Sequence, residues 1–284
     1  MDISLLQRII HRPDDTHKYN FGHVLILGGS PGMVGAPLLC GKAALRIGAG
    51  LVTIAADALT VDKLDRRVEE IMTFAIQDDP VLASDALLKF ITKRKVNSVV
   101  IGPGLKQTMG EVAKLLVPQL RLPIVLDAGG LTTFSTHLAQ LQDITQHNQQ
   151  IIVTPHAGEY ARLSGSPTTQ PDELRQQAVQ FAKNYHLTVV LKGNHTIVAR
   201  PDGSHYENQT GNPGLATAGT GDVLSGVIAG LLAQGITYTE AAELGVYIHG
   251  LSGDLAADVK TQAGLIASDV TEFLPKALAT IADR

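Results

Sequence analysis

A glycine- and threonine-rich segment, residues 210–222, precedes an apolar stretch at 223–234 and ends in Gly-Thr-Gly-Asp. Glycine lets the backbone turn its N–H groups inward, and a helix N-terminus adds about half a positive charge, so the segment predicts an anion hole suited to a phosphate. A carboxylate at its mouth can take a proton from a hydroxyl as that oxygen attacks phosphorus. The residues assigned to this chemistry are the base Asp222 and the anion-hole residues Gly219, Thr220 and Gly221.

Asp222 also has a simpler interpretation. An acidic residue in the first turn of a helix stabilises that helix by about 0.3–1 kcal/mol without any catalytic role. The residues before Asp222 favour the catalytic interpretation, because glycines and threonines around an acid are poor core material but suit phosphate transfer. We therefore expect Asp222 to act as a base.

Further glycines gather where short apolar runs of the sequence end. They fall in residues 28–36, 102–105, 127–130 and 154–159. In open α/β sheets ligands bind beyond the carboxyl ends of the strands, so these segments are expected to border one site. They contain neither a Walker A loop nor a clean GxGxxG pattern, which disfavours a P-loop enzyme and a Rossmann nicotinamide site.

Short β-branched runs alternate with segments of helical period over most of the chain. Continuous apolar strands that alternate with helices are typical of a parallel sheet covered on both faces, so an α/β fold is expected. Gly193 and Asn194 separate the last two strands and predict a two-residue hairpin loop, hence an antiparallel excursion. The expected strands are 23–28, 51–55, 97–101, 122–126, 151–154, 188–192 and 195–199, and the expected helices are 34–47, 83–93, 108–117, 156–163, 172–185, 222–234, 239–258 and 268–281.

Length and composition narrow the class of protein. The 284 residues predict one domain over 1–284, with a helical extension at 1–17. A net charge of −4, with no basic run longer than residues 93–95, argues against binding to nucleic acid or to an anionic membrane. The single cysteine, Cys40, excludes an internal disulfide and suits a reducing compartment. Because no signal peptide or membrane span is found either, a cytoplasmic protein is expected.

An ordered set of motifs in the chain resembles a known enzyme family. GTGD at 219–222 resembles the anion-hole motif of ribokinase-like sugar and vitamin kinases. The further motifs are similar to those of the NAD(P)H-hydrate dehydratases, ADP- or ATP-dependent members of the ribokinase-like superfamily. These motifs are GGSPGMVGAP (28–37), ALRIGAGLVT (44–53), GPGL (102–105), LDAGG (126–130), TPHAGE (154–159), LKG (191–193) and NPGLATAGTGDVLSG (212–226).

The resemblance implies a fold and a reaction. The fold would be ribokinase-like, with three layers around a mostly parallel central sheet. The reaction would repair the S epimer of NADHX or NADPHX, which carries a hydroxyl at C6 of the reduced nicotinamide ring. ADP or ATP, with Mg²⁺, would donate its terminal phosphoryl group to that hydroxyl, and elimination of phosphate would restore the ring double bond. The choice between ADP and ATP stays open.

The resemblance also assigns residues to each ligand. Besides Asp222, the hydrate would contact Ala36, Gly104 and His156. The adenine nucleotide would be lined by Lys192, Gly193, Asn194, His195, Thr196 and Gly221. Glu159 would act on magnesium through a bound water, because residues 156–159 are similar to the NxxE stretch of the kinases, or it is only a first-turn acid of a helix.

Two other functions stay open from the sequence. A kinase of the same fold that phosphorylates a vitamin precursor would explain GTGD but not the motif at 28–37. A regulator that binds an adenine nucleotide without turnover would gain nothing from the carboxylate of Asp222. The resemblance also implies a homo-oligomer, typically a tetramer, and coupling to a separate NAD(P)H-hydrate epimerase. Lys42 and Arg46 either reach nucleotide phosphates or extend into water.

Overall fold

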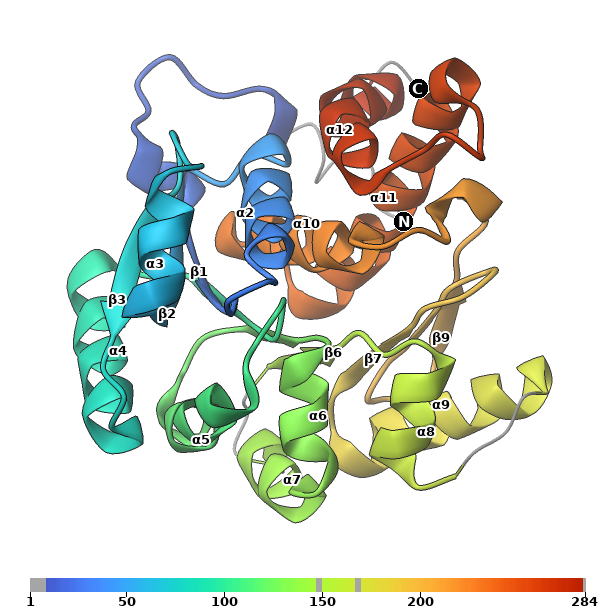
Figure 1. Cartoon of the computed structure of the whole chain (residues 1–284). Coiled ribbons are helices and arrows are strands. Elements are labelled where there is room, and N and C mark those ends of the chain that lie inside the picture. Colours follow the sequence, from blue (N-terminus) through green and yellow to red (C-terminus); the bar gives the residue numbers. More distant parts are fainter. Residues whose placement is uncertain (1–8, 147–149, 167–169, 283–284) are drawn as a thin grey trace.

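The centre of the computed structural model is a nine-stranded sheet (Figure 1), and the structure describes residues 9–146, 150–166 and 170–282. The strand order is β3-β2-β1-β4-β5-β6-β7-β8-β9, in which the pairs from β3 to β7 are parallel and β8 and β9 are antiparallel. The strands are β1 (His23–Leu27), β2 (Leu51–Asp57), β3 (Met72–Ile76), β4 (Ser98–Ile101), β5 (Ile124–Leu126), β6 (Ile151–Val153), β7 (Thr188–Leu191), β8 (Ile197–Ala199) and β9 (His205–Glu207). The mostly parallel sheet with an antiparallel excursion is confirmed.

Helices cover both faces of this sheet and complete three layers (Figure 1). Side chains alternate along β1, so that Val24 and Ile26 enter one core and Leu25 and Leu27 enter the other. The first core is closed by α2, α10, α11 and α12, and the second by α4 to α9. The helices are α2 (Gly35–Arg46), α3 (Ala58–Asp65), α4 (Pro80–Arg94), α5 (Gln107–Leu116), α6 (Gly129–Ser135), α7 (Leu138–Gln146), α8 (Ala157–Ser164), α9 (Pro171–Tyr185), α10 (Thr220–Ala233), α11 (Tyr238–Lys260) and α12 (Ala267–Ala282), with short 3₁₀ helices η1 (Lys18–Phe21), η2 (Val117–Gln119) and η3 (Pro213–Leu215).

The two-residue hairpin expected near the end of the sheet is wrong. Leu191 of β7 pairs with Ile197 of β8, so the loop between these strands spans residues 192–196. Lys192 leaves the hairpin because its backbone N–H donates to the carbonyl oxygen of Pro155, in the segment after β6, at 2.8 Å. A longer loop therefore projects from this end of the sheet.

Several elements do not follow the sequence patterns. The strands β3 and β9 and the helices α3, α6 and α7 were not expected. β3 and β9 are edge strands whose side chains, apart from Ile76, are exposed or half-buried, so they lack a buried apolar run. The helical extension at 1–17 is wrong for residues 11–17, where Pro13 disfavours helical backbone at the residue before it. Helix is found at residues 9 and 10, and residues 1–8 lie outside the described part of the chain.

The helix α10 fixes the position of its own N-terminus by dense packing. Its side chains are almost all buried, and it packs against α2, α11 and the strands β1, β4 and β5. Gly226 allows α2 to approach closely, because a Cβ there would lie 2.0 Å from the carbonyl oxygen of the buried Cys40. In the described ranges no helix, α10 included, has the length and apolar character that a membrane span needs.

Replacing Gly226 by alanine should destabilise the protein. The added methyl group would meet the Cys40 carbonyl, a backbone atom that cannot swing aside as a flexible side chain can. Over-packing of a filled core typically costs about 1–3 kcal/mol of unfolding free energy. Urea unfolding followed by circular dichroism measures this change. Gly35→Ala, at the start of α2 with open space around it, is the matched control and should leave stability unchanged or slightly higher. A Gly226→Ala protein as stable as the wild type would contradict the packing argument.

Candidate functional site

Four elements bring charged side chains together at the carboxyl edge of the sheet. Asp127 follows β5, Lys192 follows β7, Glu159 lies in the first turn of α8, and Asp222 lies in the first turn of α10. Parallel strands end at the same edge of a sheet, so residues far apart in the chain become neighbours there. Asp127 and Lys192, for example, are 65 positions apart and form a hydrogen bond.

The N-terminus of α10 has the geometry of an anion hole. Gly219, its N-cap, adopts φ +91°, a backbone conformation that favours glycine, and a Cβ there would lie 2.6 Å from Leu39 Cδ1 of α2, so that side chain would have to move. The hydroxyl of Thr220 shares its hydrogen between the carbonyl oxygens of Leu215, at 2.8 Å, and Thr217, at 3.0 Å, which fixes the loop before the helix. The first N–H groups of a helix have no partner inside it. This end of α10 can therefore hold an anionic group.

The carboxyl group of Asp222 has a pKa raised to about 7. Burial is the main cause, because it penalises the charged form, and the negative charges of Asp127 and Glu159 add to the effect while the Lys192 ammonium opposes it. A carboxyl with a pKa near 7 exchanges its proton at neutral pH. That is the property a general base needs.

Lys192 is an ion-paired side chain beside the first turn of α10. Its Nζ lies 2.9 Å from Asp127 Oδ1 and 3.6 Å from Glu159 Oε2. Asp127 is 2% exposed, and its other oxygen accepts a hydrogen bond from Ser225 Oγ at 2.8 Å. Burial alone would lower the pKa of Lys192, but the Asp127 and Glu159 carboxylates outweigh burial and raise it. A Cβ on Gly221 would lie 3.2 Å from Lys192 Nζ, so a fixed positive charge sits at the anion hole.

Asp127 and Ser225 were not assigned to the site from the sequence. The signal for Asp127 is a carboxylate directly after a buried apolar strand, since a buried acid needs a partner. The signal for Ser225 is a hydroxyl within the apolar stretch 223–234. Each signal is weak alone, and only the folded chain shows that these two side chains bind one another.

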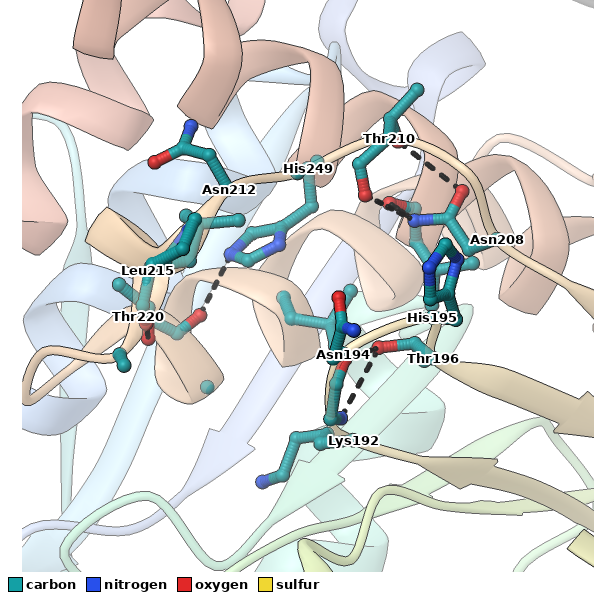
Figure 2. Close-up of a pocket in the computed structure, with 18 residues that line it drawn as sticks. Lys192, Asn194, His195, Thr196, Asn208, Thr210, Asn212, Leu215, Thr220 and His249 are labelled. Atoms are coloured by element: carbon teal, nitrogen blue, oxygen red, sulfur yellow. Dashed lines mark hydrogen bonds between the residues drawn. The ribbon is translucent and has the colours of Figure 1, made fainter. Parts of the chain in front are cut away.

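A cavity of about 460 Å³ opens beside the N-terminus of α10 (Figure 2). It lies between the loop 192–196, residues 208–216 and the helix α11. The structure thus brings the predicted nucleotide residues together with part of the anion hole, although Gly219 and Asp222 are outside the cavity lining. The predicted site residues that line it are Lys192, Gly193, Asn194, His195, Thr196, Thr220 and Gly221. Its volume is within the range of small-molecule sites.

His156 and Glu159 together cap the N-terminus of α8. His156 Nδ1 accepts the N–H groups of Gly158, at 3.0 Å, and Glu159, at 3.3 Å, and Glu159 Oε2 accepts the N–H of His156 at 2.9 Å. Glu159 therefore has the helix-capping role that its sequence position allowed. The side chain of His156 is 54% exposed and lies outside the cavity lining. Within the described residues no three side chains of metal-ligating type form a group that could hold a metal ion.

Ala36 and Gly104 lie side by side, outside the cavity lining. A Cβ on Gly104, where φ is +64°, would lie 3.3 Å from Ala36 Cβ. Neither residue lines the cavity, but α2, which carries Ala36, also carries the Leu39 side chain that packs on Gly219. The pair is therefore connected to the N-terminus of α10 through α2.

Three further polar side chains take structural or solvent positions. Lys42 and Arg46 of α2 are exposed and do not line the cavity, so they extend into water. Asp254 of α11 accepts hydrogen bonds from Gly211 N–H and from Asn212 Nδ2, both at 2.9 Å. It thereby holds one wall of the cavity against α11.

Replacing Asp222 by asparagine should stabilise the folded protein at pH 8. The pKa of an unfolded aspartic acid is about 4, whereas that of Asp222 is raised to about 7 in the fold. The folded state therefore binds the proton more tightly, and its stability falls as the pH rises from about 4 to about 7. Asparagine cannot ionise, so we expect a gain on the order of 1–3 kcal/mol at pH 8 and a smaller gain at pH 5.

Urea unfolding of both proteins at pH 5 and pH 8 measures this difference. The matched control is Asp62→Asn, which removes an exposed carboxylate from a surface ion pair with Arg66 and should show no such pH dependence. Equal stabilities of Asp222→Asn and wild type at both pH values would contradict the raised pKa.

The chain is similar to proteins of one family along most of its length. The family model described as NAD(P)H-hydrate dehydratase matches residues 24–276. The ADP-dependent (S)-NAD(P)H-hydrate dehydratase of Neisseria meningitidis is 37% identical over 265 residues, which cover 91% of this chain and 86% of that protein. The bifunctional NAD(P)H-hydrate repair enzyme Nnr of Moorella thermoacetica is 42% identical over 268 residues, which cover 92% of this chain and 50% of that protein. The chain thus spans about half the length of such bifunctional relatives.

Solved structures share the fold. The ADP/ATP-dependent NAD(P)H-hydrate dehydratase from Bacillus subtilis, co-crystallized with ATP/Mg²⁺, matches with a TM-score of 0.78 and 27% identity, covering 98% of this chain and 96% of that one. Arabidopsis thaliana ribokinase, complexed with ribose and ATP, matches with a TM-score of 0.56 and 14% identity, covering 89% and 98%. This second likeness concerns the fold alone, and it confirms the ribokinase-like three-layer architecture.

Proposed function

The chain belongs to the NAD(P)H-hydrate dehydratase family, and we propose that it is a carbon–oxygen lyase that dehydrates the S epimer of hydrated NADH or NADPH at the expense of ADP or ATP. The observation that carries this proposal is the position of Asp222. Its carboxyl group, with a pKa of about 7, lies at a helix N-terminus that borders a nucleotide-sized cavity and contacts α2, the helix that carries Ala36. A base at that point can take the proton of a hydroxyl that attacks a phosphate held at the helix N-terminus.

In the proposed reaction Asp222 takes the proton of the C6 hydroxyl while that oxygen attacks the terminal phosphorus of the nucleotide. The bond from the terminal phosphorus to the bridging oxygen breaks. The leaving group is AMP when ADP is the donor and ADP when ATP is the donor. The C6–O bond of the new phosphate ester then breaks, and a proton leaves the neighbouring ring carbon. Phosphate is released and the ring double bond returns. The water lost by the hydrate is taken up in cleaving the phosphoanhydride.

The residues around Asp222 support this transfer. The N–H groups of Gly219, Thr220 and Gly221 are assigned to the transferring phosphoryl group, where fixed donors stabilise developing charge. The Lys192 ammonium adds a positive charge beside Gly221, and its ion pair with Asp127 holds it there. Ala36, Gly104 and the exposed ring of His156 are assigned to the hydrate.

The proposal includes Mg²⁺ as a cofactor. This ion usually keeps several waters and is held by one or two carboxylates together with substrate phosphates. The described residues fit that mode, because they offer separate carboxylates and no group of three metal ligands. Glu159 would hold the ion through a water, and its hydrogen bond with the His156 N–H keeps its carboxylate in place. The chemistry supplied would be neutralisation of phosphate charge.

The proposal extends to the setting of the enzyme. We propose a cytoplasmic homotetramer that works together with an NAD(P)H-hydrate epimerase activity, which would supply the S epimer. The family to which the chain belongs supports these assignments, and bifunctional repair enzymes among its relatives support the coupling. Analytical ultracentrifugation tests the tetramer.

Incubation of the purified protein with hydrated NADH, Mg²⁺ and ADP or ATP tests the activity. Recovery of absorbance at the nicotinamide band, with one phosphate released per NADH, is the expected result. Parallel reactions with the two nucleotides identify the donor. A stable phosphoester on another alcohol would instead identify a kinase, and nucleotide binding without any product would identify a regulator.

Asp222→Asn should abolish turnover and leave nucleotide binding nearly intact. The amide cannot accept the hydroxyl proton, and loss of a positioned base typically costs about 10²- to 10⁴-fold in rate. Turnover is followed at the nicotinamide band and ADP affinity by calorimetry. Asp62→Asn, exposed and remote in sequence, is the control for a charge change alone. Near-normal turnover in Asp222→Asn would defeat the assignment of the base.

The turnover of the wild-type protein should rise with pH through about 7. Asp222 acts as a base only when ionised, and its pKa is raised to about 7. Below that value kcat/KM should fall about tenfold per pH unit, and above it should level off. Initial rates at subsaturating hydrate between pH 5.5 and pH 8.5 give this profile. A rate independent of pH over that range would show that Asp222 is not the titrating base.

A further inference from the structure

His249 of α11 is a buried side chain of the cavity that the proposed reaction does not use. It is 8% exposed, and its Nε2 lies 3.0 Å from the carbonyl oxygen of Thr220 in the first turn of α10 (Figure 2). A carbonyl oxygen only accepts hydrogen bonds. Nε2 must therefore carry the ring hydrogen and donate it to Thr220.

The ring of His249 is neutral at physiological pH. Burial lowers its pKa to about 4; the hydrogen bond to Thr220 opposes this shift, and the charge of Lys192 adds to it. In a neutral imidazole with its hydrogen on Nε2, the other nitrogen, Nδ1, bears a lone pair and accepts a hydrogen bond. The hydrogen bond to Thr220 thus fixes the tautomer of the His249 ring and leaves Nδ1 as its one acceptor.

That acceptor is left for a ligand. Among the residues that the structure describes, His249 forms a hydrogen bond through Nε2 alone. The ring lies between Thr220 and the loop 192–196, within the cavity lining (Figure 2). Neighbouring polar side chains are already engaged, since Asn208 donates to two carbonyl oxygens and Asn212 donates to a carboxylate. Because His249 lines the cavity, its Nδ1 is available to a hydrogen-bond donor on a ligand.

The order of groups along a nucleotide limits which donor can reach His249. Its bond to Thr220 places the ring next to the anion hole, where the proposed reaction puts the phosphates. Phosphate oxygens are acceptors and cannot donate to Nδ1. Beyond the phosphates come the ribose hydroxyls, and only then the base. The ribose hydroxyls are therefore the first donors that a nucleotide offers there.

We propose that His249 is a specificity-determining residue whose Nδ1 accepts a hydrogen bond from a ribose hydroxyl of the nucleotide that drives the reaction. This inference rests on the proposed function, because it takes the cavity as the nucleotide site. Loss of one such hydrogen bond should weaken binding by about 3- to 10-fold.

Calorimetric titration with ADP, 2′-deoxy-ADP and 3′-deoxy-ADP in the presence of Mg²⁺ tests the proposal. The wild-type protein should bind one of the deoxynucleotides about 3- to 10-fold more weakly than ADP. His249→Phe removes the acceptor and should abolish that preference. His249→Gln keeps an amide donor for Thr220 and a carbonyl acceptor for the ligand, so it should retain part of it. His205→Phe, on the exposed face of β9, is the matched control and should bind as the wild type does.

Each result supports or overturns the proposal. Equal binding of ADP and both deoxynucleotides by the wild-type protein overturns it, even if the phenylalanine variant does not fold. An unchanged preference in a folded His249→Phe also overturns it. The variant can also be titrated with inosine diphosphate, which lacks the exocyclic amine of ADP. If His249→Phe loses only a preference for ADP over inosine diphosphate, the proposal is overturned and His249 is assigned to the base. If the wild type neither binds ADP nor restores NADH, the proposed function fails too; if it does both and the variant keeps its preference, only this inference fails.

Discussion

The ammonium of Lys192 lies against the carboxylates of Asp127 and Glu159, and this network joins four elements at one edge of the sheet. Asp127 enters from β5, Lys192 from β7 and Glu159 from α8, while Ser225 of α10 binds the second oxygen of Asp127. A buried ion pair contributes little net stability, because the loss of hydration offsets the attraction, but removing one partner leaves an uncompensated charge. The network therefore acts mainly on geometry. It fixes where the N-terminus of α10 stands relative to the strand ends.

Burial and the two acids of this network oppose ionisation of Asp222, although Lys192 favours it. Packing elsewhere in the fold offsets the resulting loss of stability. A pKa of about 7 means that burial and the nearby acids disfavour the ionised form that the proposed reaction needs. The helix α10 can tolerate this because its side chains are almost all buried and Gly226 brings it into backbone contact with α2. Functional groups work best on rigid elements. If α10 were looser, Asp222 would reach water, its pKa would return toward the usual value, and it would be a weaker base.

Local sequence patterns predicted most of the fold, because the core strands are continuous apolar runs and most helices have a clear period. They failed where a distant contact decides the outcome. The loop 192–196 is longer than a hairpin turn because Lys192 pairs with the segment after β6. Asp127 and Ser225 are 98 positions apart, and no spacing records that they bind one another. The glycine-rich motif before α10, by contrast, is local, so the start of this helix just after Gly219 could be predicted from the sequence.

The place of the anion hole follows from the transfer that it is proposed to serve. A phosphoryl group that passes from a nucleotide to a hydrate must be held where both can reach it. The N-terminus of α10 borders the cavity through Thr220 and Gly221 and contacts, through Gly219, the helix α2 that carries Ala36. Helix N–H groups can face both sides only if no side chain covers them. A Cβ on Gly221 would lie 3.2 Å from Lys192 Nζ and would crowd the ammonium, and one on Gly219 would meet Leu39. These two glycines therefore do more than allow a turn, because they keep side chains away from the helix N-terminus at which the transfer is proposed.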